Sequence, residues 1–282
     1  MTFQGAQFVR GAMQRAARSA RHILFPDACL TCNRQVGHHG ALCPACWQNV
    51  TMIDDPVCAI TGLPFTHDLG KGALSADAIA NPPHYTKARA AAVHAGTARQ
   101  LVSRLKYHDQ LMLAPLMAQW MVRAGRPFWA EADRIIPVPL HWRRFVGRRY
   151  NQAAELARHV AAHTGVALDT QSLCRKRATT PQVGLSATAR HANVKGSFDV
   201  PDSCRIHIEG RTIVLIDDVY TTGATVNAAA KALKKAKAAN VYVLTFSRVL
   251  PGATDPLNLP QTSFRERLMR LYQRQPRREN DG

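Results

Sequence analysis

The sequence predicts an α/β protein with a mostly parallel, open sheet flanked by helices, preceded by a small zinc-ribbon-like domain. Three observations predict this architecture. Short β-branched runs, such as Ile-Val-Leu-Ile at 213–216, are typical of strands buried in a parallel sheet. Segments with helical periodicity alternate with these runs, as parallel strands joined by right-handed crossovers require. Two closely spaced cysteine pairs precede all of these segments.

The first 26 residues are basic. They contain Arg10, Arg15, Arg18 and Arg21, and they contain no acidic residue. They lack the continuous apolar core of a secretory signal. We expect a basic amphipathic helix over 1–26, with a transit peptide as the alternative.

Residues 27–70 form the predicted zinc-binding domain. The four cysteines of the C-x2-C-x10-C-x2-C pattern are Cys29, Cys32, Cys43 and Cys46. Two such pairs can hold one Zn²⁺ in a closed, tetrahedral shell of four sulfurs, which has a structural role because no coordination position stays open. An iron–sulfur cluster and a redox dithiol are the alternatives. The sequence Cys58-Ala-Ile-Thr61 looks like a further metal-binding turn without its second cysteine, so Cys58 is expected to be a small buried residue.

Residues 71–83 are predicted to be a linker, because the surrounding stretch is rich in Gly, Ala and Pro. The larger domain is expected over 84–250. Its predicted helices span 87–107, 111–124, 151–163 (with Asn151 as N-cap), 186–193 and 226–239. Its predicted strands span 134–140, 213–216 and 242–246.

The stretch 213–225 carries the clearest chemistry. Asp217 and Asp218 follow the apolar run at the place where such a strand would end. A loop of small residues comes next: Thr221, Thr222, Gly223, Ala224 and Thr225. A loop that enters a helix at the carboxyl end of a strand offers free backbone N–H groups and a positive dipole end, which suit a phosphate.

The two carboxylates serve a different part of a ligand. They repel phosphate, but they can accept hydrogen bonds from sugar hydroxyls or face a divalent cation. A 5-phosphorylated ribose bound with Mg²⁺ needs both halves of this arrangement. The structural alternative is that the carboxylates cap helices or are solvated.

Two further segments are strongly basic. The segment 141–150 contains Arg143, Arg144, Arg148 and Arg149, a group suited to pyrophosphate or nucleic-acid phosphate, with a solvated loop as the alternative. Residues 251–282 are expected to be a basic, partly disordered tail that binds nucleic acid or aids solubility. Of the 37 Lys and Arg residues and 19 Asp and Glu residues, residues 81–282 hold 31 and 14, so almost all of the net charge of +18 lies there. Such a charge favours anionic partners but does not identify them.

Several sequence blocks together resemble the ComF family of competence-associated proteins. They are the four cysteines, Leu105-Lys106-Tyr107, Val138-Pro139-Leu140, Tyr150-Asn151-Gln152, Thr180-Pro181-Gln182, Asn193-Val194 and the block from Asp217 to Thr225, in that order. The resemblance covers about residues 20–250, and it implies a zinc domain followed by a type I phosphoribosyltransferase-like domain. Two positions depart from the pattern: Thr61 stands where a cysteine would complete the second metal-binding turn, and Arg149 stands where a glycine is expected.

The resemblance also implies roles for individual residues. Asp217 and Asp218, the implied catalytic pair, would hold the ribose hydroxyls and the metal environment of phosphoribosyl pyrophosphate (PRPP). The residues from Thr221 to Thr225 would hold its 5-phosphate. Lys106 and Tyr107 would lie near its pyrophosphate, and Arg143, Arg144, Arg148 and Arg149 would cover it. The implied cofactors are structural Zn²⁺ and Mg²⁺ bound with PRPP.

These features predict a PRPP-binding protein that transfers the phosphoribosyl group to an unidentified acceptor and is associated with DNA uptake or processing. The alternative is an accessory protein of natural transformation that senses PRPP or binds single-stranded DNA without catalysis. Single-stranded DNA and other proteins of the competence machinery are the further expected partners. No apolar run approaches the about 18 residues of a membrane span, and the odd number of cysteines favours a reducing compartment, so a cytoplasmic location is expected.

Overall fold

The computed structural model describes residues 27–107, 110–140, 150–176 and 196–251. The chain forms two compact units, Met1–Gln48 and Asn49–Gly282, and each is described by itself. Several predicted segments lie outside the described residues: the basic helix at 1–26, the arginine-rich loop at 141–149, the helix at 186–193 and the tail from 252 onward.

The described part of the first unit is built from tight turns and one short helix. Ala28 bridges Gln35 in antiparallel fashion around a turn at which Asn33 has a positive φ of 59°. Helix α2 (Pro44–Gln48) follows and has no buried residue. A segment with so little apolar core depends on another source of stability, which in such small domains is usually a metal or a disulfide.

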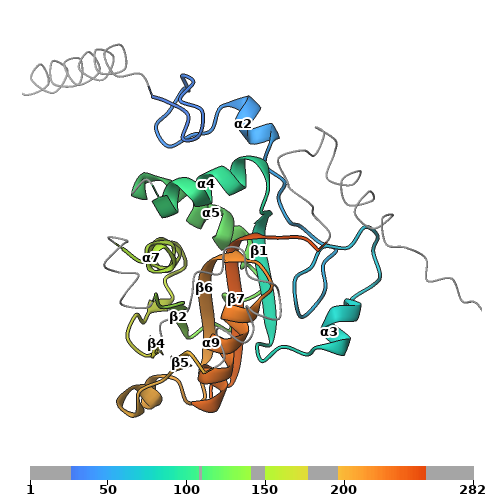
Figure 1. The fold of residues 1–282 in the computed structure, drawn as a ribbon, viewed down its shortest axis with the longest axis vertical. Coiled ribbons are helices and arrows are strands. Elements are labelled where there is room, and N and C mark those ends of the chain that lie inside the picture. The colour runs from blue at the N-terminus through green and yellow to red at the C-terminus, as the bar shows by residue number, and fades with distance from the viewer. Residues whose placement is uncertain (1–26, 108–109, 141–149, 177–195, 252–282) are drawn as a thin grey trace, which may run out of the picture. The chain divides into compact units, whose positions relative to one another are not determined.

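The second unit contains a five-stranded sheet with the order β1-β7-β6-β2-β3, and every neighbouring pair is parallel (Figure 1). The strands are β1 (Lys87–Val93), β2 (Arg134–Pro137), β3 (Ala167–Leu168), β6 (Thr212–Tyr220) and β7 (Asn240–Arg248). A small antiparallel ribbon pairs β4 (Cys174–Arg175) with β5 (Phe198–Asp199). The predicted fold class, an α/β protein with a mostly parallel sheet, is confirmed.

Helices cover both faces of the sheet. On one face lie α5 (Ala114–Ala124) and α7 (Gln152–Thr164), where Trp120 stacks on Phe246 with ring centroids 5.7 Å apart. On the other face α9 (Ala224–Lys235) buries Val226, Ala230 and Leu233 against the central strands. Because both faces are covered, β6 and β7 are apolar at almost every position of their first halves.

The prediction of one helix over 87–107 is wrong in its first half. Residues 87–93 form β1, and the helix α4 begins only at Gly96 and ends at Tyr107. The run Lys-Ala-Arg-Ala-Ala-Ala favours a helix by intrinsic propensity, but tertiary packing overrides it. Small side chains let the preceding chain approach closely: Ala88 N donates to Ile60 O at 2.6 Å, and a Cβ on Gly62 would lie 2.4 Å from Ala88 O.

The remaining predicted helices and strands are present with shifted ends. The helix predicted over 111–124 is divided into a 3₁₀ turn, Leu111–Leu113, and α5. The helix α7 has Asn151 as its N-cap, as predicted, with the side-chain oxygen accepting from Ala153 N at 3.0 Å. The helix predicted over 226–239 stops at residue 235, because Lys237 has a positive φ of 64° and Ala238 N turns back to Leu233 O.

The segment 49–83 belongs to the second unit and packs against its larger part. Cys58 is fully buried in a small cluster with Leu63, Ala78 and Leu250, as expected for a small buried residue. Ala78 belongs to the short helix α3 (Ala76–Ala80), whose N-cap is Ser75. The residues 71–83, predicted as a linker, therefore include a helix that contributes to the core.

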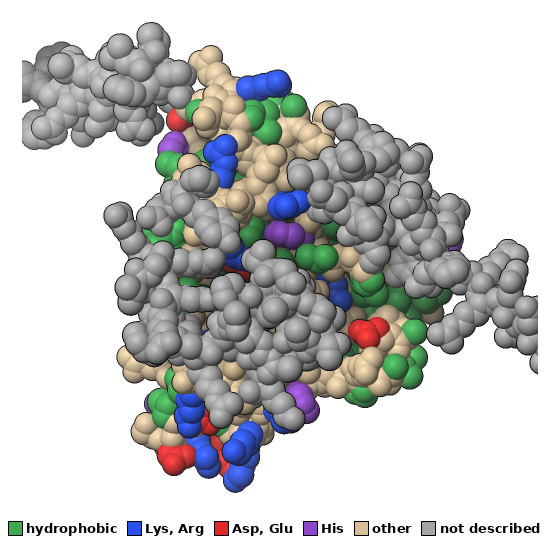
Figure 2. All heavy atoms as spheres, in the orientation of Figure 1, with side chains coloured by type: hydrophobic (Ala, Val, Ile, Leu, Met, Phe, Trp, Pro, Cys, Tyr) green, Lys and Arg blue, Asp and Glu red, His purple; other side chains and the backbone are tan. Residues whose placement is uncertain are grey.

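Basic side chains gather with acidic ones at one end of the described surface of the second unit (Figure 2). Ion pairs on the surface of this unit include Arg205 with Asp202 at 2.9 Å, Lys237 with Glu209 at 2.8 Å, and Arg211 with Asp133 at 3.3 Å. Among the described residues, no helix combines the length and the apolar character that crossing a bilayer requires.

Candidate functional site

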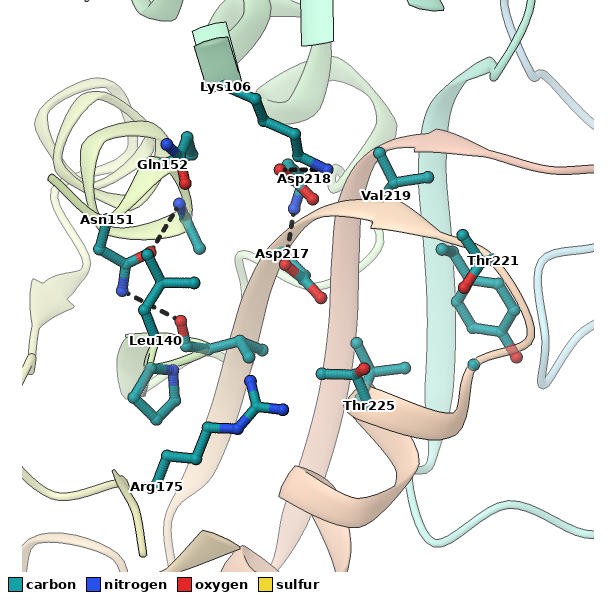
Figure 3. Close-up of a pocket in the computed structure, with 16 residues that line it drawn as sticks. Lys106, Leu140, Asn151, Gln152, Arg175, Asp217, Asp218, Val219, Thr221 and Thr225 are labelled. Carbon is teal, nitrogen blue, oxygen red and sulfur yellow. Dashed lines mark hydrogen bonds and ion pairs between the residues drawn. The ribbon is translucent and has the colours of Figure 1, made fainter. Parts of the chain in front are cut away.

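A pocket of about 140 Å³ lies at the carboxyl ends of β2 and β6, in the second unit (Figure 3). This is the edge at which open parallel sheets bind ligands. It forms because β2 ends at Pro137, opposite Ile216, while β6 continues to Tyr220. The residues that line it are Lys106, Val138, Pro139, Leu140, Asn151, Gln152, Ala153, Arg175, Asp217, Asp218, Val219, Tyr220, Thr221, Gly223, Thr225 and Val226.

The sequence led us to expect Asp217 and Asp218 after the end of the strand. The structure places them within β6, which continues to Tyr220. β7 stays paired with β6 along this stretch, with Asp217 opposite Thr245 and Tyr220 opposite Arg248. The backbone N–H of Asp218 also donates to Asp217 Oδ1 at 2.9 Å. The backbone that carries the two carboxylates is therefore held by the hydrogen bonds of the sheet and not by a turn.

Lys106, in the last turn of α4, reaches into the pocket toward the carboxylates (Figure 3). Its Nζ lies 2.8 Å from Asp218 Oδ2, and both side chains are largely buried. Burial, and then the neighbouring charge of Asp218, raise the pKa of Asp217 from 3.8 to about 7, although Lys106 acts in the opposite direction. A bound cation would reduce the repulsion between these two carboxylates, and their hard oxygen donors fit Mg²⁺.

The loop of small residues lies beside the carboxylates, where it opens α9. Gly223 is the N-cap of α9 and has a φ of +76°, the left-handed conformation that favours glycine. Thr221, Gly223 and Thr225 line the pocket, while Thr222 Oγ1 accepts a hydrogen bond from Ala224 N. Ala224 itself is buried. The N-terminal end of α9 thus lies at the same pocket as the two carboxylates, a position that suits an anion.

Three polar residues at the pocket, which come from other parts of the chain, had no predicted role in binding. Arg175 extends from β4 toward Asp217 from the side opposite Lys106 (Figure 3), and its guanidinium carbon lies 5.2 Å from the centre of the Phe198 ring. Gln152 and Asn151 begin α7, and Asn151 Nδ2 donates to Val138 O at 3.1 Å. The N-cap position of Asn151 was a signal in the sequence that could have identified it. Arg175 had no such signal, because it lies in a strand of only two residues.

His94, which directly follows β1, is close enough to Lys106 and Asp218 to be affected by their charges, and it was also missed. Its Nδ1 is 2.8 Å from Ser247 Oγ on the neighbouring strand. Burial, followed by the charge of Lys106, lowers the pKa of His94 to about 4. The imidazole is therefore neutral at physiological pH and adds no positive charge to the site.

The remaining predicted site residues are only partly placed. Tyr107 is the last residue of α4, and its side chain lies outside the described residues. Arg143, Arg144, Arg148 and Arg149 also lie outside them. Tyr150, which follows these arginines, donates from its hydroxyl to Leu105 O at 2.6 Å, so the end of α4 and the start of α7 are joined.

The four cysteines of the first unit come together as predicted. The Sγ atoms of Cys29, Cys32, Cys43 and Cys46 all lie within 4.8 Å of one another. Around a tetrahedral Zn²⁺ with Zn–S bonds of about 2.3 Å, neighbouring sulfurs are about 3.8 Å apart; the Cys32 and Cys43 sulfurs are 3.5 Å apart. Cys43 N also donates to Cys29 Sγ at 3.2 Å, a typical hydrogen bond to a metal-bound sulfur. The set fits a structural zinc ion, and among the described residues it is the one such group.

Comparisons with known proteins agree with both halves of this description. A family model described as a double zinc ribbon domain matches residues 20–79. A second model, described as a phosphoribosyl transferase domain, matches residues 151–261. The first match extends through Cys58 and Thr61, so it includes the turn that lacks a second cysteine.

Related proteins cover most of the chain. The DNA utilization protein YhgH of Shigella flexneri and that of Escherichia coli K12 are both 31% identical over 236 residues, which are 81% of this chain and 100% of theirs. The competence protein ComFC of Bacillus subtilis is 33% identical over 118 residues, 40% of this chain and 44% of its own.

One solved structure with similarity is the glutamine PRPP amidotransferase of B. subtilis. It is 21% identical and has a TM-score of 0.32, over 46% of this chain and 25% of that one. The assignment rests on the relatives that cover most of the chain and on the two matched domains. The chain belongs to the family of the DNA utilization protein YhgH and the ComF competence proteins, with a zinc ribbon followed by a phosphoribosyltransferase-type domain.

Proposed function

We propose that the chain binds PRPP together with Mg²⁺ at the pocket between β2 and β6. The observation that carries the proposal is that two kinds of group meet there. The carboxylates of Asp217 and Asp218 and the N-terminal end of α9 line one cavity. PRPP carries a sugar diol and a phosphate at the spacing of one ribose, so it uses both.

The 5-phosphate binds at the start of α9. Thr221 and Thr225 offer hydroxyl donors, and the left-handed Gly223 lets the backbone N–H groups approach the anion. Asp217 and Asp218 accept hydrogen bonds from the ribose hydroxyls. Mg²⁺, when bound, neutralises the pyrophosphate and strengthens it as a leaving group.

The pyrophosphate lies toward Lys106 in this arrangement. The ammonium group of Lys106 is already in the pocket, 2.8 Å from Asp218 Oδ2. Tyr107 and the four arginines of 141–149 follow in the proposal as groups that cover the pyrophosphate; the side chain of Tyr107 and all four arginines lie outside the described residues.

We further propose that the site transfers the phosphoribosyl group. The bond from ribose C1 to the pyrophosphate oxygen breaks, and pyrophosphate leaves with the bonding electrons. The acceptor forms the new bond at C1 with a lone pair and releases its proton to water. Positioning and electrostatic stabilisation of the leaving group carry such a step. Arg175 lines the pocket on the side away from Lys106. In this proposal the acceptor approaches C1 from that side.

Calorimetry tests binding and a pyrophosphate-release assay tests turnover. Wild-type protein is titrated with PRPP in the presence and absence of Mg²⁺, alongside the Asp217→Asn/Asp218→Asn double variant. We expect Mg²⁺-dependent binding that the double variant loses. Absence of binding in the wild type refutes the proposal, whereas binding without pyrophosphate release across nucleobases, amines and DNA leaves a PRPP-sensing protein.

A second function, binding of single-stranded DNA in DNA uptake or processing, is supported by the names of the relatives, which refer to DNA utilization and competence. The net charge of +18 is consistent with it. Partners in the competence machinery and a cytoplasmic location belong to the same proposal. Affinity for an oligonucleotide should fall steeply with salt and should exceed that of a charge-matched control protein; equal affinity contradicts it.

A further inference from the structure

The turn that opens α9 rests directly on a tyrosine side chain. A Cβ placed on Gly223 would lie 2.2 Å from Tyr220 Oη and 2.5 Å from Tyr220 Cζ. The backbone of the turn therefore touches the end of the Tyr220 ring. The first N–H groups of α9 follow Gly223 immediately, so the position of the Tyr220 ring determines the position of these N–H groups.

Two buried groups hold the Tyr220 ring. Its hydroxyl is 2.9 Å from the hydroxyl of Tyr85, and the guanidinium carbon of Arg248 lies 4.1 Å from its centre. Tyr85, Tyr220 and Arg248 are exposed by only 4%, 9% and 7%. At this depth a cation stacked on an aromatic ring is strongly favoured over an unpaired one.

Arg248 is fixed in turn by a segment far away in the sequence. It is the last residue of β7, opposite Tyr220 in the register, and its Nη1 donates to the backbone oxygen of Thr61. Thr61 belongs to the turn 58–64 that resembles a metal-binding turn with one cysteine. That turn is tight: the N–H groups of Thr61 and Ser75 donate to Cys58 Sγ at 3.4 and 3.3 Å.

Among the described residues, Cys58 belongs to no group of three or more metal-ligating side chains. The hydrogen bond from Arg248 instead ties the turn to the sheet. The same guanidinium thus has two neighbours: the carbonyl of a turn that resembles half of a zinc ribbon, and the tyrosine beneath the turn that opens α9.

We propose that Arg248 is a positioning residue for the 5-phosphate loop. It holds the Tyr220 ring, and through the ring it fixes Gly223 and the first N–H groups of α9. It contacts neither ribose nor phosphate itself, since it is absent from the residues that line the pocket. The inference rests on the proposed function only for the identity of the anion.

Arg248→Met is the first test, in the full-length protein. Amide hydrogen exchange is measured without ligand on the peptide that covers 219–226, and affinities for ribose 5-phosphate and inorganic pyrophosphate are measured separately. We expect faster exchange in this peptide and an affinity for ribose 5-phosphate about tenfold lower, a size that residues without ligand contact reach. Pyrophosphate affinity should change by less than about twofold, because that ligand is held near Lys106.

Arg89→Met is the matched control. Arg89 is a half-buried arginine of the same unit, and like Arg248 it donates from Nη1 to a backbone oxygen, here that of Ala88 at 2.8 Å. The Arg89→Met variant loses the same charge as Arg248→Met, but the guanidinium that it removes is not the one stacked on Tyr220. We expect the exchange of 219–226 and the affinity for ribose 5-phosphate to stay at wild-type values.

Unchanged exchange at 219–226 in Arg248→Met overturns the inference, and so does an equal loss of affinity for both ligands. Should Arg248→Met fail to fold, Arg248→Lys keeps the cation but loses the planar stacking group, and the same exchange measurement decides. If wild-type protein binds no ribose 5-phosphate, the proposed function fails while the exchange result still settles whether Arg248 positions the loop.

Discussion

Lys106 Nζ lies 2.8 Å from Asp218 Oδ2, so an ion pair joins the last turn of α4 to the central strand β6 at the pocket. The two side chains are exposed by 22% and 12%, so solvent weakens the pair only in part. In the free protein the ammonium group neutralises Asp218. Anionic oxygens of a ligand would give Lys106 a second set of partners.

Replacing Lys106 tests this relationship. We expect Lys106→Gln to lower the affinity for PRPP about tenfold, because the amide does not balance the charge of the pyrophosphate. Calorimetry with Mg²⁺ present measures the effect. Lys231→Gln, on the exposed surface of α9, removes the same charge and should bind as the wild type does. Equal affinities in all three proteins would contradict the role of Lys106.

Gly223→Ala should damage the phosphate loop more than a left-handed backbone alone explains. At a φ of +76° an alanine costs about 1–2 kcal/mol, and here its Cβ would also lie 2.2 Å from Tyr220 Oη. Gly210→Ala is the control, because Gly210 has a φ of +69° and open space around its Cβ position. We expect both variants to lose stability in urea denaturation, Gly223→Ala more so, and only Gly223→Ala to lose affinity for ribose 5-phosphate. Equal losses in both variants would show that the contact with Tyr220 has no effect.

The raised pKa of Asp217 predicts a pH dependence of stability. Since burial and Asp218 raise the pKa from 3.8 to about 7, the folded state holds this proton more tightly than the unfolded state. The resulting stability is complete below about pH 4 and is lost as the pH rises to about 7. Solvent reaches Asp217 through the pocket, so we expect a loss on the order of 2 kcal/mol.

Comparison with Asp217→Asn isolates this effect from other titrating groups. The variant has no proton to lose at this position, so its free energy of unfolding relative to the wild type should increase between pH 5 and pH 8. Denaturation in urea at both pH values measures it. Asp202→Asn, at a side chain that is 90% exposed, should show the same difference from the wild type at both pH values. A constant difference for Asp217→Asn would disprove the predicted titration.

Loss of the cysteine site should unfold the first unit. In Cys43→Ser we expect one equivalent of zinc to be lost and amide exchange to accelerate across 27–48, because this segment has little apolar core. Elemental analysis and exchange on the same sample measure both effects. Cys204→Ser, outside the cluster, is the control and should keep its zinc. Zinc content equal to that of the wild type in Cys43→Ser would exclude the assignment.

The parts of the fold that were predictable are those in which local and tertiary preferences agree. The apolar run of β6, the N-cap of α7 and the four-cysteine pattern each have a local signature and a matching environment. β1 was not predictable, because its alanines favour a helix and only close contacts with the preceding chain make them a strand. Those contacts are invisible without the fold.

The site residues that belong to one continuous motif were predictable. The site residues that only the fold brings together were not. Asp217, Asp218 and the loop to Thr225 follow one another in sequence, and Lys106 reaches them from the last turn of α4. Arg175 comes from a strand of two residues with no periodicity to mark it. The contact of Arg248 with Tyr220 was equally hidden, since the two residues meet only through the register of β6 with β7.

That register continues past both carboxylates to the last pair of the ladder, Tyr220 opposite Arg248. The backbone that carries the oxygen donors consequently loses its conformational freedom when the sheet folds, before a ligand binds. Entry of a sugar phosphate then has little backbone to organise along β6, and the entropic penalty of binding is confined to the turn after it. Affinity in such a site responds to mutations that loosen the sheet even when every polar group of the pocket is intact.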